Sequence, residues 1–199
     1  MKKLLKNKSI IACIISVAVM AAVSLLYFYP DVFEGNTLMQ HDTQQGIAIG
    51  QEVNEYKAQS GETSWWTNSL FSGMPTFQIS PSYSSGKLIK FASNAFQLWL
   101  PSPAGLLFMM MLGFFILLLS MRVKWYLALP GALAYGFSSY FIIIIGAGHI
   151  WKFITLAYVP PTIAGMVLCY RGKYLAGGAT AALFAMLQIA GNHIQMSYY

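Results

Sequence analysis

From Thr63 to Tyr199 this sequence contains no aspartate and no glutamate. Its six carboxylate side chains all lie between residues 31 and 62: Asp31, Glu34, Asp42, Glu52, Glu55 and Glu62. Chemistry that needs a carboxylate, whether proton transfer or binding of a hard metal ion, is therefore confined to that stretch.

Charged residues of either sign are scarce. They make up 9% of the chain, against about 25% in soluble domains, while 57% of the residues are hydrophobic and the mean hydropathy is +0.56. This composition excludes an ordinary soluble domain and favours a protein embedded in a bilayer. The net charge of +6 is not gathered in one patch, so nucleic-acid binding is not expected. Cys13 and Cys169 fall inside apolar runs, which supports neither a disulfide framework nor a thiolate metal site.

Long uncharged runs predict the fold class: all-α, a polytopic helical membrane protein with about five transmembrane helices. A charge at a helix centre costs about 2.5–3.5 kcal/mol, so uninterrupted apolar runs of this length indicate spans. The expected spans are residues 10–29, 101–121, 125–147, 153–170 and 174–190. A cleaved signal peptide is the alternative for the first, with Ala22-Val23-Ser24 as its cleavage site, but the run is longer than the usual 7–15 residues.

Basic residues indicate the orientation. Four lysines lie in the N-terminal segment 1–9, and Arg122/Lys124 and Arg171/Lys173 stand between later runs. All three clusters face the cytoplasm if the N-terminus is inside. The long loop 30–100, the turn 148–152 and the segment 191–199 are then outside, and the protein is a multi-pass protein of the cytoplasmic membrane. The end of the sequence suggests a fragment of a longer protein.

The loop 30–100 is expected to be partly helical. Ile49, Val53 and Tyr56 recur at helical spacing, and Ser60-Gly61 would end that helix. An apolar stripe between Leu88 and Trp99 predicts a second amphipathic helix, resting in the outer membrane interface.

Prolines stand inside two of the predicted spans. Pro130 and Pro160-Pro161 should bend or break their helices, either as packing kinks or as the wall of a cavity.

Asp42 has two interpretations. It lies three residues before Gln45 and just ahead of a predicted helix, a position typical of an N-cap. It is also a polar, outer-face carboxylate that could take a proton.

Other polar residues are predicted on the same side of the membrane. Lys152, beside His149, is a cation on the side that basic residues usually avoid, where it would bind a phosphate or extend to the interface. Trp65 and Trp66 are interfacial anchors or sugar-stacking platforms. The spacing of His149 and His193 to Asp42 fits no short metal-binding motif. Whether the protein uses a divalent metal ion is left open by the sequence. The candidate binding residues are His41, Gln44, Gln45, Trp65, Trp66, His149, Lys152, Asn192, His193 and Gln195.

Four segments taken together resemble the bacterial YfhO-type membrane protein family. They are residues 41–45 (HDTQQ), 66–75 (WTNSLFSGMP), 148–152 (GHIWK) and 192–195 (NHIQ). The likeness covers the whole chain as the N-terminal portion of a longer family member. That family is similar to the GT-C class of glycosyltransferases, which take a sugar from a polyprenyl-phosphate carrier on the outer face of the membrane.

The resemblance implies a catalytic role for Asp42, the only position matching the acidic residue that such enzymes carry early in the first outer loop. It also implies a lipid-linked sugar as substrate, a cell-envelope acceptor, and further spans outside this chain. Two other hypotheses are a polysaccharide export or flipping component and a membrane scaffold with an outer docking loop. A transporter should carry ionisable residues at mid-membrane, and these spans have almost none.

Overall fold

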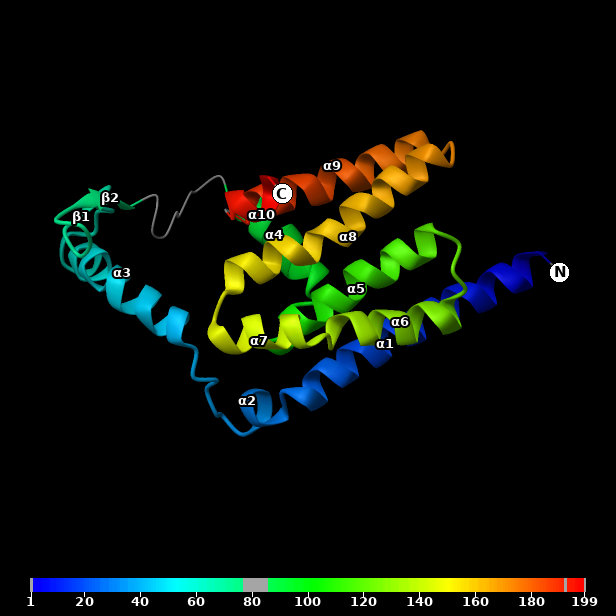
Figure 1. Ribbon diagram of the computed structural model, residues 1–199, viewed down its shortest axis with the longest axis horizontal. Helices are drawn as coiled ribbons and strands as arrows, with labels where there is room; N and C mark the ends of the chain where they lie inside the picture. Colours follow the sequence, from blue (N-terminus) through cyan, green and yellow to red (C-terminus); the bar gives the residue numbers. More distant parts are fainter. Residues whose placement is uncertain (1, 77–85, 192, 199) are drawn as a thin grey trace.

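The computed structural model describes residues 2–76, 86–191 and 193–198 of the 199-residue chain. It is 76% helical and nearly all-α, as the apolar runs predict. Long helices lie side by side in a bundle, and α3 with a short β-ribbon extends from one end of it (Figure 1). The elements are α1 Lys2–Tyr27, α2 Tyr29–Phe33, α3 His41–Ser60, β1 Trp66–Thr67, β2 Met74–Pro75, α4 Lys87–Phe96, α5 Ala104–Ser120, α6 Trp125–Gly136, α7 Ser139–Ala147, α8 Ile150–Tyr170, α9 Tyr174–Ala190 and α10 Ile194–Tyr198.

Within the described residues, two helices are long and apolar enough to cross a membrane: Ile10–Tyr27 of α1 and the whole of α8. The pair α6 and α7, bent by 45° at its break, would make a third span. Helices α5 and α9 are equally apolar but have 17 residues each. The structure therefore has two or three candidate spans, and the five predicted runs all form apolar helices.

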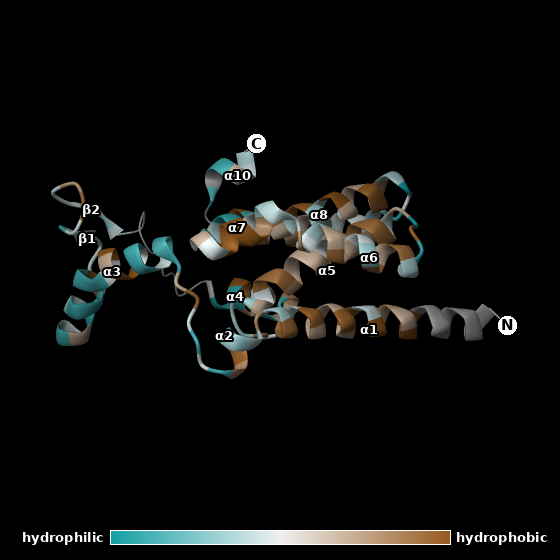
Figure 2. Ribbon diagram, turned by 60° about the horizontal axis from the view of Figure 1, so that its bottom comes forward, coloured by the Kyte–Doolittle hydropathy of each residue, from teal (hydrophilic) through white to brown (hydrophobic). Residues whose placement is uncertain are grey.

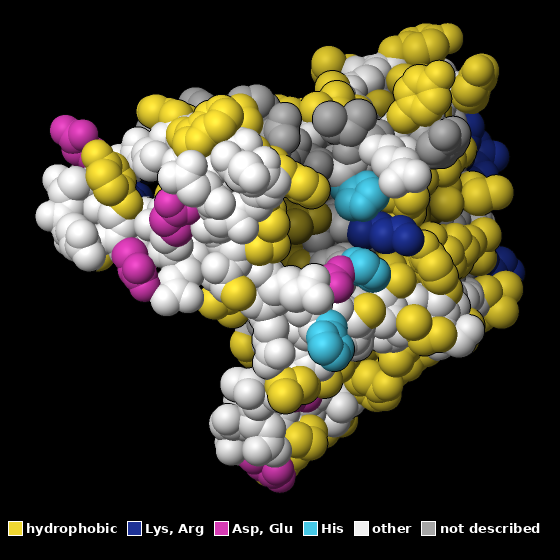
Figure 3. Space-filling view, turned by 60° about the vertical axis from the view of Figure 1, so that its left-hand side comes forward, with side chains coloured by type: hydrophobic (Ala, Val, Ile, Leu, Met, Phe, Trp, Pro, Cys, Tyr) yellow, Lys and Arg dark blue, Asp and Glu magenta, His cyan; other side chains and the backbone are white. Residues whose placement is uncertain are grey.

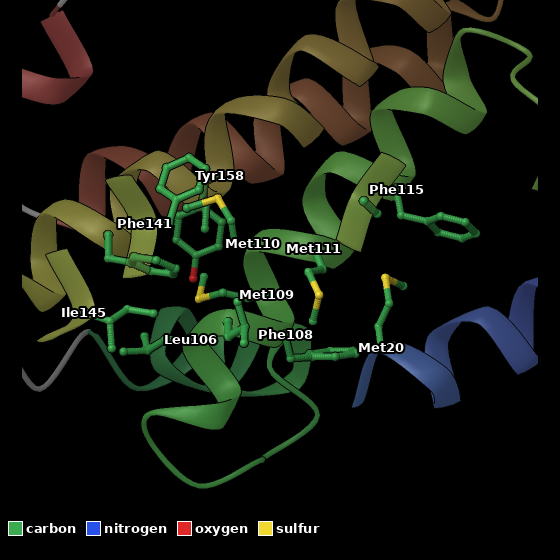
Figure 4. Packing of buried hydrophobic residues seen from close by; sticks show 14 of the residues in the cluster. Met20, Leu106, Phe108, Met109, Met110, Met111, Phe115, Phe141, Ile145 and Tyr158 are labelled. Carbon is green, nitrogen blue, oxygen red and sulfur yellow. The ribbon is translucent and has the colours of Figure 1, made fainter. Parts of the chain in front are cut away.

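Helix α5 forms the centre of the hydrophobic core. It packs against α1, α6 and α8, and every residue from Ala104 to Met111 is buried. A helix that is apolar all round is expected in such a position, because each of its faces meets another helix. Figure 4 shows Met109, Met110 and Met111 of α5 among Phe141, Tyr158 and Met20 from its neighbours.

Small residues let α8 and α9 approach closely. A Cβ on Gly177 would lie 2.6 Å from the backbone nitrogen and from the sulfur of Cys169, and one on Gly165 would lie 2.4 Å from the nitrogen of Ala181. A Cβ on Gly113 of α5 would likewise lie 2.7 Å from the carbonyl oxygen of Ala157 in α8. Close backbone contact of this kind is how apolar helices gain packing energy where no hydrophobic force drives them together.

Prolines do not end the helices that contain them. Pro130 lies inside α6, and Pro160 and Pro161 lie inside α8, which continues to Tyr170. Of the predicted bend or break at these prolines, the break is wrong, because both helices continue through them. The break in the third apolar run falls instead at Phe137-Ser138, where Ser138 has an extended backbone (φ −59°, ψ 140°). Gly136, a poor helix former, ends α6 at this point.

Both helices expected in the loop 30–100 are present. Helix α3 ends at Ser60, and Gly61 follows in the left-handed conformation (φ 75°) with its N–H donating to the carbonyl of Lys57. Helix α4 contains the predicted stripe as far as Phe96, and Trp99 lies beyond its end. Ile89, Ala92 and Phe96 pack against the core, and Tyr158 Oη donates to Ser93 Oγ at 2.7 Å. Helix α3 is mostly hydrophilic, in contrast to the apolar α1 (Figure 2), and none of its residues is buried.

Candidate functional site

The turn between α7 and α8 places His149 at the end of the bundle. Gly148 takes a left-handed conformation (φ 89°), and two hydrogen bonds close α7, from Gly148 N to Ile145 O and from His149 N to Ile144 O, both 3.1 Å. This is the Schellman arrangement, which turns the chain sharply and favours glycine at that position. His149 then serves as the N-cap residue of α8.

The start of α3 is docked against this turn. Gln40 donates from Nε2 to the carbonyl of Ile145 at 2.7 Å and accepts at Oε1 from Thr43 Oγ1 at 2.9 Å. Gly148 leaves room for this contact, because a Cβ there would lie 2.9 Å from Gln40 Cβ and 3.0 Å from Thr43 Oγ1. Two segments far apart in the sequence are thereby fixed side by side.

The docking of α3 on this turn brings the side chain of Asp42 into contact with that of His149. Their Oδ2 and Nδ1 atoms are 2.5 Å apart, and both side chains are almost half exposed. Asp42 does not cap α3. The N-cap residue is Gln40, no side chain bonds the helix end, and Asp42 lies in the first turn. The capping interpretation is therefore wrong, although a carboxylate in the first turn still interacts favourably with the helix dipole.

Lys152 lies one turn of α8 beyond His149. Its Nζ stands 5.4 Å from the centre of the Tyr140 ring. In the described part of the chain the only ion pair is the one between Asp42 and His149, so no carboxylate neutralises this half-buried cation. The ammonium group is thus held by an aromatic face and stays available to an anion.

The other two histidines lie on the same face of the molecule. Figure 3 shows all three imidazole groups there; an acidic side chain touches one of them, and a basic side chain lies between two of them, beside a hollow. His41 opens α3 and is exposed. His193 precedes α10, where its Nδ1 accepts from the backbone nitrogen of Met196 at 3.4 Å.

The remaining predicted binding residues divide into three groups. Gln44 donates to the sulfur of Met39 at 2.9 Å, and Gln45 and Gln195 are exposed. Trp65 and Trp66 do not join Asp42, because they lie at the ribbon, which is hydrogen-bonded to Glu52 in the second half of α3. Asn192 lies outside the described residues.

A second polar cluster, centred on Glu52 of α3, was not expected from the sequence. Glu52 Oε2 accepts from Thr67 Oγ1 at 2.5 Å, from Ser69 Oγ at 2.8 Å and from the Asn68 backbone nitrogen at 2.9 Å. The hydrogen bonds from Thr67 and Ser69 stabilise the carboxylate and lower the pKa of Glu52 from 4.5 to about 2. A TNS run is visible in the sequence, but nothing in it indicates which of the six carboxylates it binds.

The Glu52 cluster fixes the ribbon on α3. Trp66 lies over Gly73: a Cβ added to this glycine would be 2.7 Å from the indole ring. The indole Nε1 of Trp66 donates to Asn68 Oδ1 at 3.3 Å. Phe71 at the tip has a positive φ of 51° and is 88% exposed. Glu52 follows Asp42 by ten residues, so this cluster lies about 15 Å along the helix from the Asp42–His149 pair. The two sites are separate.

Comparisons with protein-family models, with curated proteins and with solved structures found no match to this chain.

Proposed function

We propose that this chain is the N-terminal part of a YfhO-like membrane glycosyltransferase of the GT-C type. It would move a sugar from a polyprenyl-phosphate carrier to a cell-envelope acceptor on the outer face of the bacterial cytoplasmic membrane. The proposal includes five spans, formed by α1, α5, the bent pair α6–α7, α8 and α9, with the N-terminus inside. The two shorter helices then cross a core of about 30 Å with help from their flanking residues.

The observation that carries this proposal is the Asp42–His149 pair. Asp42 belongs to the loop between the first two apolar helices, and His149 to the turn between the third and the fourth. With the proposed orientation both lie outside, where a lipid-linked sugar would be presented. A carboxylate and an imidazole in contact can together remove a proton from an acceptor hydroxyl.

Lys152 supplies the complementary charge. Departure of the carrier adds a second negative charge to its phosphate, and a cation already in place lowers the energy of the transition state. Lys152 has no carboxylate partner among the described residues, so it need not break an ion pair to meet the phosphate. His41 and His193, on the same face, are further donors for the carrier or the acceptor.

The test is sugar transfer by the full-length protein in membranes. We expect Asp42→Asn to reduce incorporation of labelled sugar into envelope polymers by about 10²–10⁴-fold, with an unchanged amount of protein in the membrane fraction. The matched control is Asp31→Asn in α2, which makes the same chemical change in the same loop and should transfer normally. Normal transfer by Asp42→Asn would remove Asp42 from the mechanism.

A further inference from the structure

The contact between Asp42 and His149 fixes where the hydrogen on the imidazole sits. A carboxylate offers only acceptor atoms, so at 2.5 Å from Asp42 Oδ2 it is His149 Nδ1 that carries the hydrogen. In the neutral ring the second nitrogen, Nε2, is then left with its lone pair. No other hydrogen bond or ion pair of the His149 ring is seen among residues 2–76, 86–191 and 193–198.

The surroundings hold this arrangement in place from both sides. His149 is fixed by the Schellman turn and by its position at the N-cap of α8. Asp42 is fixed because Gln40 and Thr43 anchor the first turn of α3 against Ile145 and Gly148. A carboxylate that holds one ring nitrogen fixes the tautomer and supports the charge that forms when the other nitrogen takes a proton.

We propose that His149 Nε2, and not Asp42, takes the proton of the acceptor, and that Asp42 is the residue that positions His149. This inference rests on the proposed glycosyl transfer. In the step, the acceptor hydroxyl oxygen attacks the anomeric carbon and forms the new glycosidic bond. The bond from that carbon to the phosphate oxygen breaks, its electron pair leaves with the carrier phosphate, and the hydroxyl proton passes to Nε2.

The alternative assignment of roles to Asp42 and His149 predicts a different result. If Asp42 were the base and His149 only a cation for the phosphate, the two residues would act on different atoms and their losses would multiply. If they act as one unit, removing both costs no more than removing His149. We therefore expect the double variant Asp42→Ala/His149→Ala of the full-length protein to transfer sugar at the rate of His149→Ala alone.

Chemical rescue identifies the atom that takes the proton. Added imidazole should restore part of the activity of His149→Ala and none of that of Asp42→Ala, which still has its own imidazole. His149→Gln should stay as inactive as His149→Ala, although its amide can still donate to Asp42. Losses that multiply, or normal transfer by His149→Gln, would each overturn the assignment while leaving the glycosyl transfer itself intact.

A measurement on residues 1–199 alone needs no activity. Nitrogen-15 NMR of histidine-labelled protein in lipid nanodiscs should show neutral His149 with hydrogen on Nδ1, and Asp42→Ala should shift it toward hydrogen on Nε2, whereas Asp31→Ala should not. His149→Gln assigns the signal among the three histidines. A wild-type ring with its hydrogen on Nε2 would overturn the inference. Full-length protein that transfers no sugar at all would refute the proposed function and, with it, the catalytic role of Nε2.

Discussion

Gly148 and Gln40 are in such close contact that a Cβ on the glycine would lie 2.9 Å from Cβ of the glutamine. Gly148 ends α7, and Gln40 precedes α3, so their contact joins the bundle to the loop that carries the acidic residues. The Asp42–His149 pair depends on it, because Asp42 lies two residues after Gln40 and His149 directly follows Gly148.

Gly148→Ala should undock α3 from the turn. The added methyl group meets Gln40 and Thr43, and an L-residue in a left-handed conformation costs about 1–2 kcal/mol in addition. We expect faster cleavage by chymotrypsin at Leu38 and Met39, next to the docked segment, together with a lower melting temperature.

Gly172→Ala is the matched control for this change. Gly172 has a similar φ of 77°, but nothing lies within 4 Å of the position that a Cβ would take there. It should lose only the stability that the left-handed backbone conformation costs, without faster cleavage at Leu38 and Met39. Equal cleavage of the two variants would mean that the contact with Gln40 and Thr43 does not hold α3.

Glu52→Gln should release the ribbon from α3. Its carboxylate accepts hydrogen bonds from Thr67, Asn68 and Ser69, and an amide presents a donor where those groups need an acceptor. Limited proteolysis between residues 61 and 76 should become faster. Glu55→Gln removes a carboxylate one helical turn away, which accepts a hydrogen bond from Gln51, and should leave the cleavage rate unchanged.

The same carboxylate predicts a response to acid. Because the pKa of Glu52 falls from 4.5 to about 2 on folding, its stabilisation is complete above about pH 4.5 and is lost as the pH falls through about 2. With Trp99, Trp125 and Trp151 replaced by phenylalanine, the fluorescence of Trp65 and Trp66 should change near pH 2. A transition near pH 4.5, or an identical one in Glu52→Gln, would contradict this.

Single cysteines test the proposed orientation. After Cys13 and Cys169 are replaced by serine, cysteines at positions 42, 149 and 193 should each react with a membrane-impermeant reagent added from outside. A cysteine at Gly172, in the turn between α8 and α9, should react only after the membrane is permeabilised. Protection of position 42, 149 or 193 in a folded protein would contradict the orientation and the proposed site together.

The helices could be predicted because apolar spacing is a local property of the sequence. The end of α3 at Ser60-Gly61 and the position of α4 follow from residues within a few turns of each other. A break was one of the two outcomes predicted for the prolines, and it does not occur: a proline removes one hydrogen bond locally, but packing decides whether the helix continues. Pro161 lies against Gly113 of α5, where the missing side chain leaves room for its ring.

Residues 31–62 hold every carboxylate, and the sequence alone determined that any chemistry needing one belongs to that stretch. The sequence did not determine which hydrogen-bonding partner each carboxylate has. Only the tertiary structure decided that Asp42 contacts His149 and that Glu52 binds Thr67 and Ser69. The physical reason is that a carboxylate accepts equally well from an imidazole, a hydroxyl or a helix end, so its partner is chosen by the packing of distant segments and not by its neighbours in the chain.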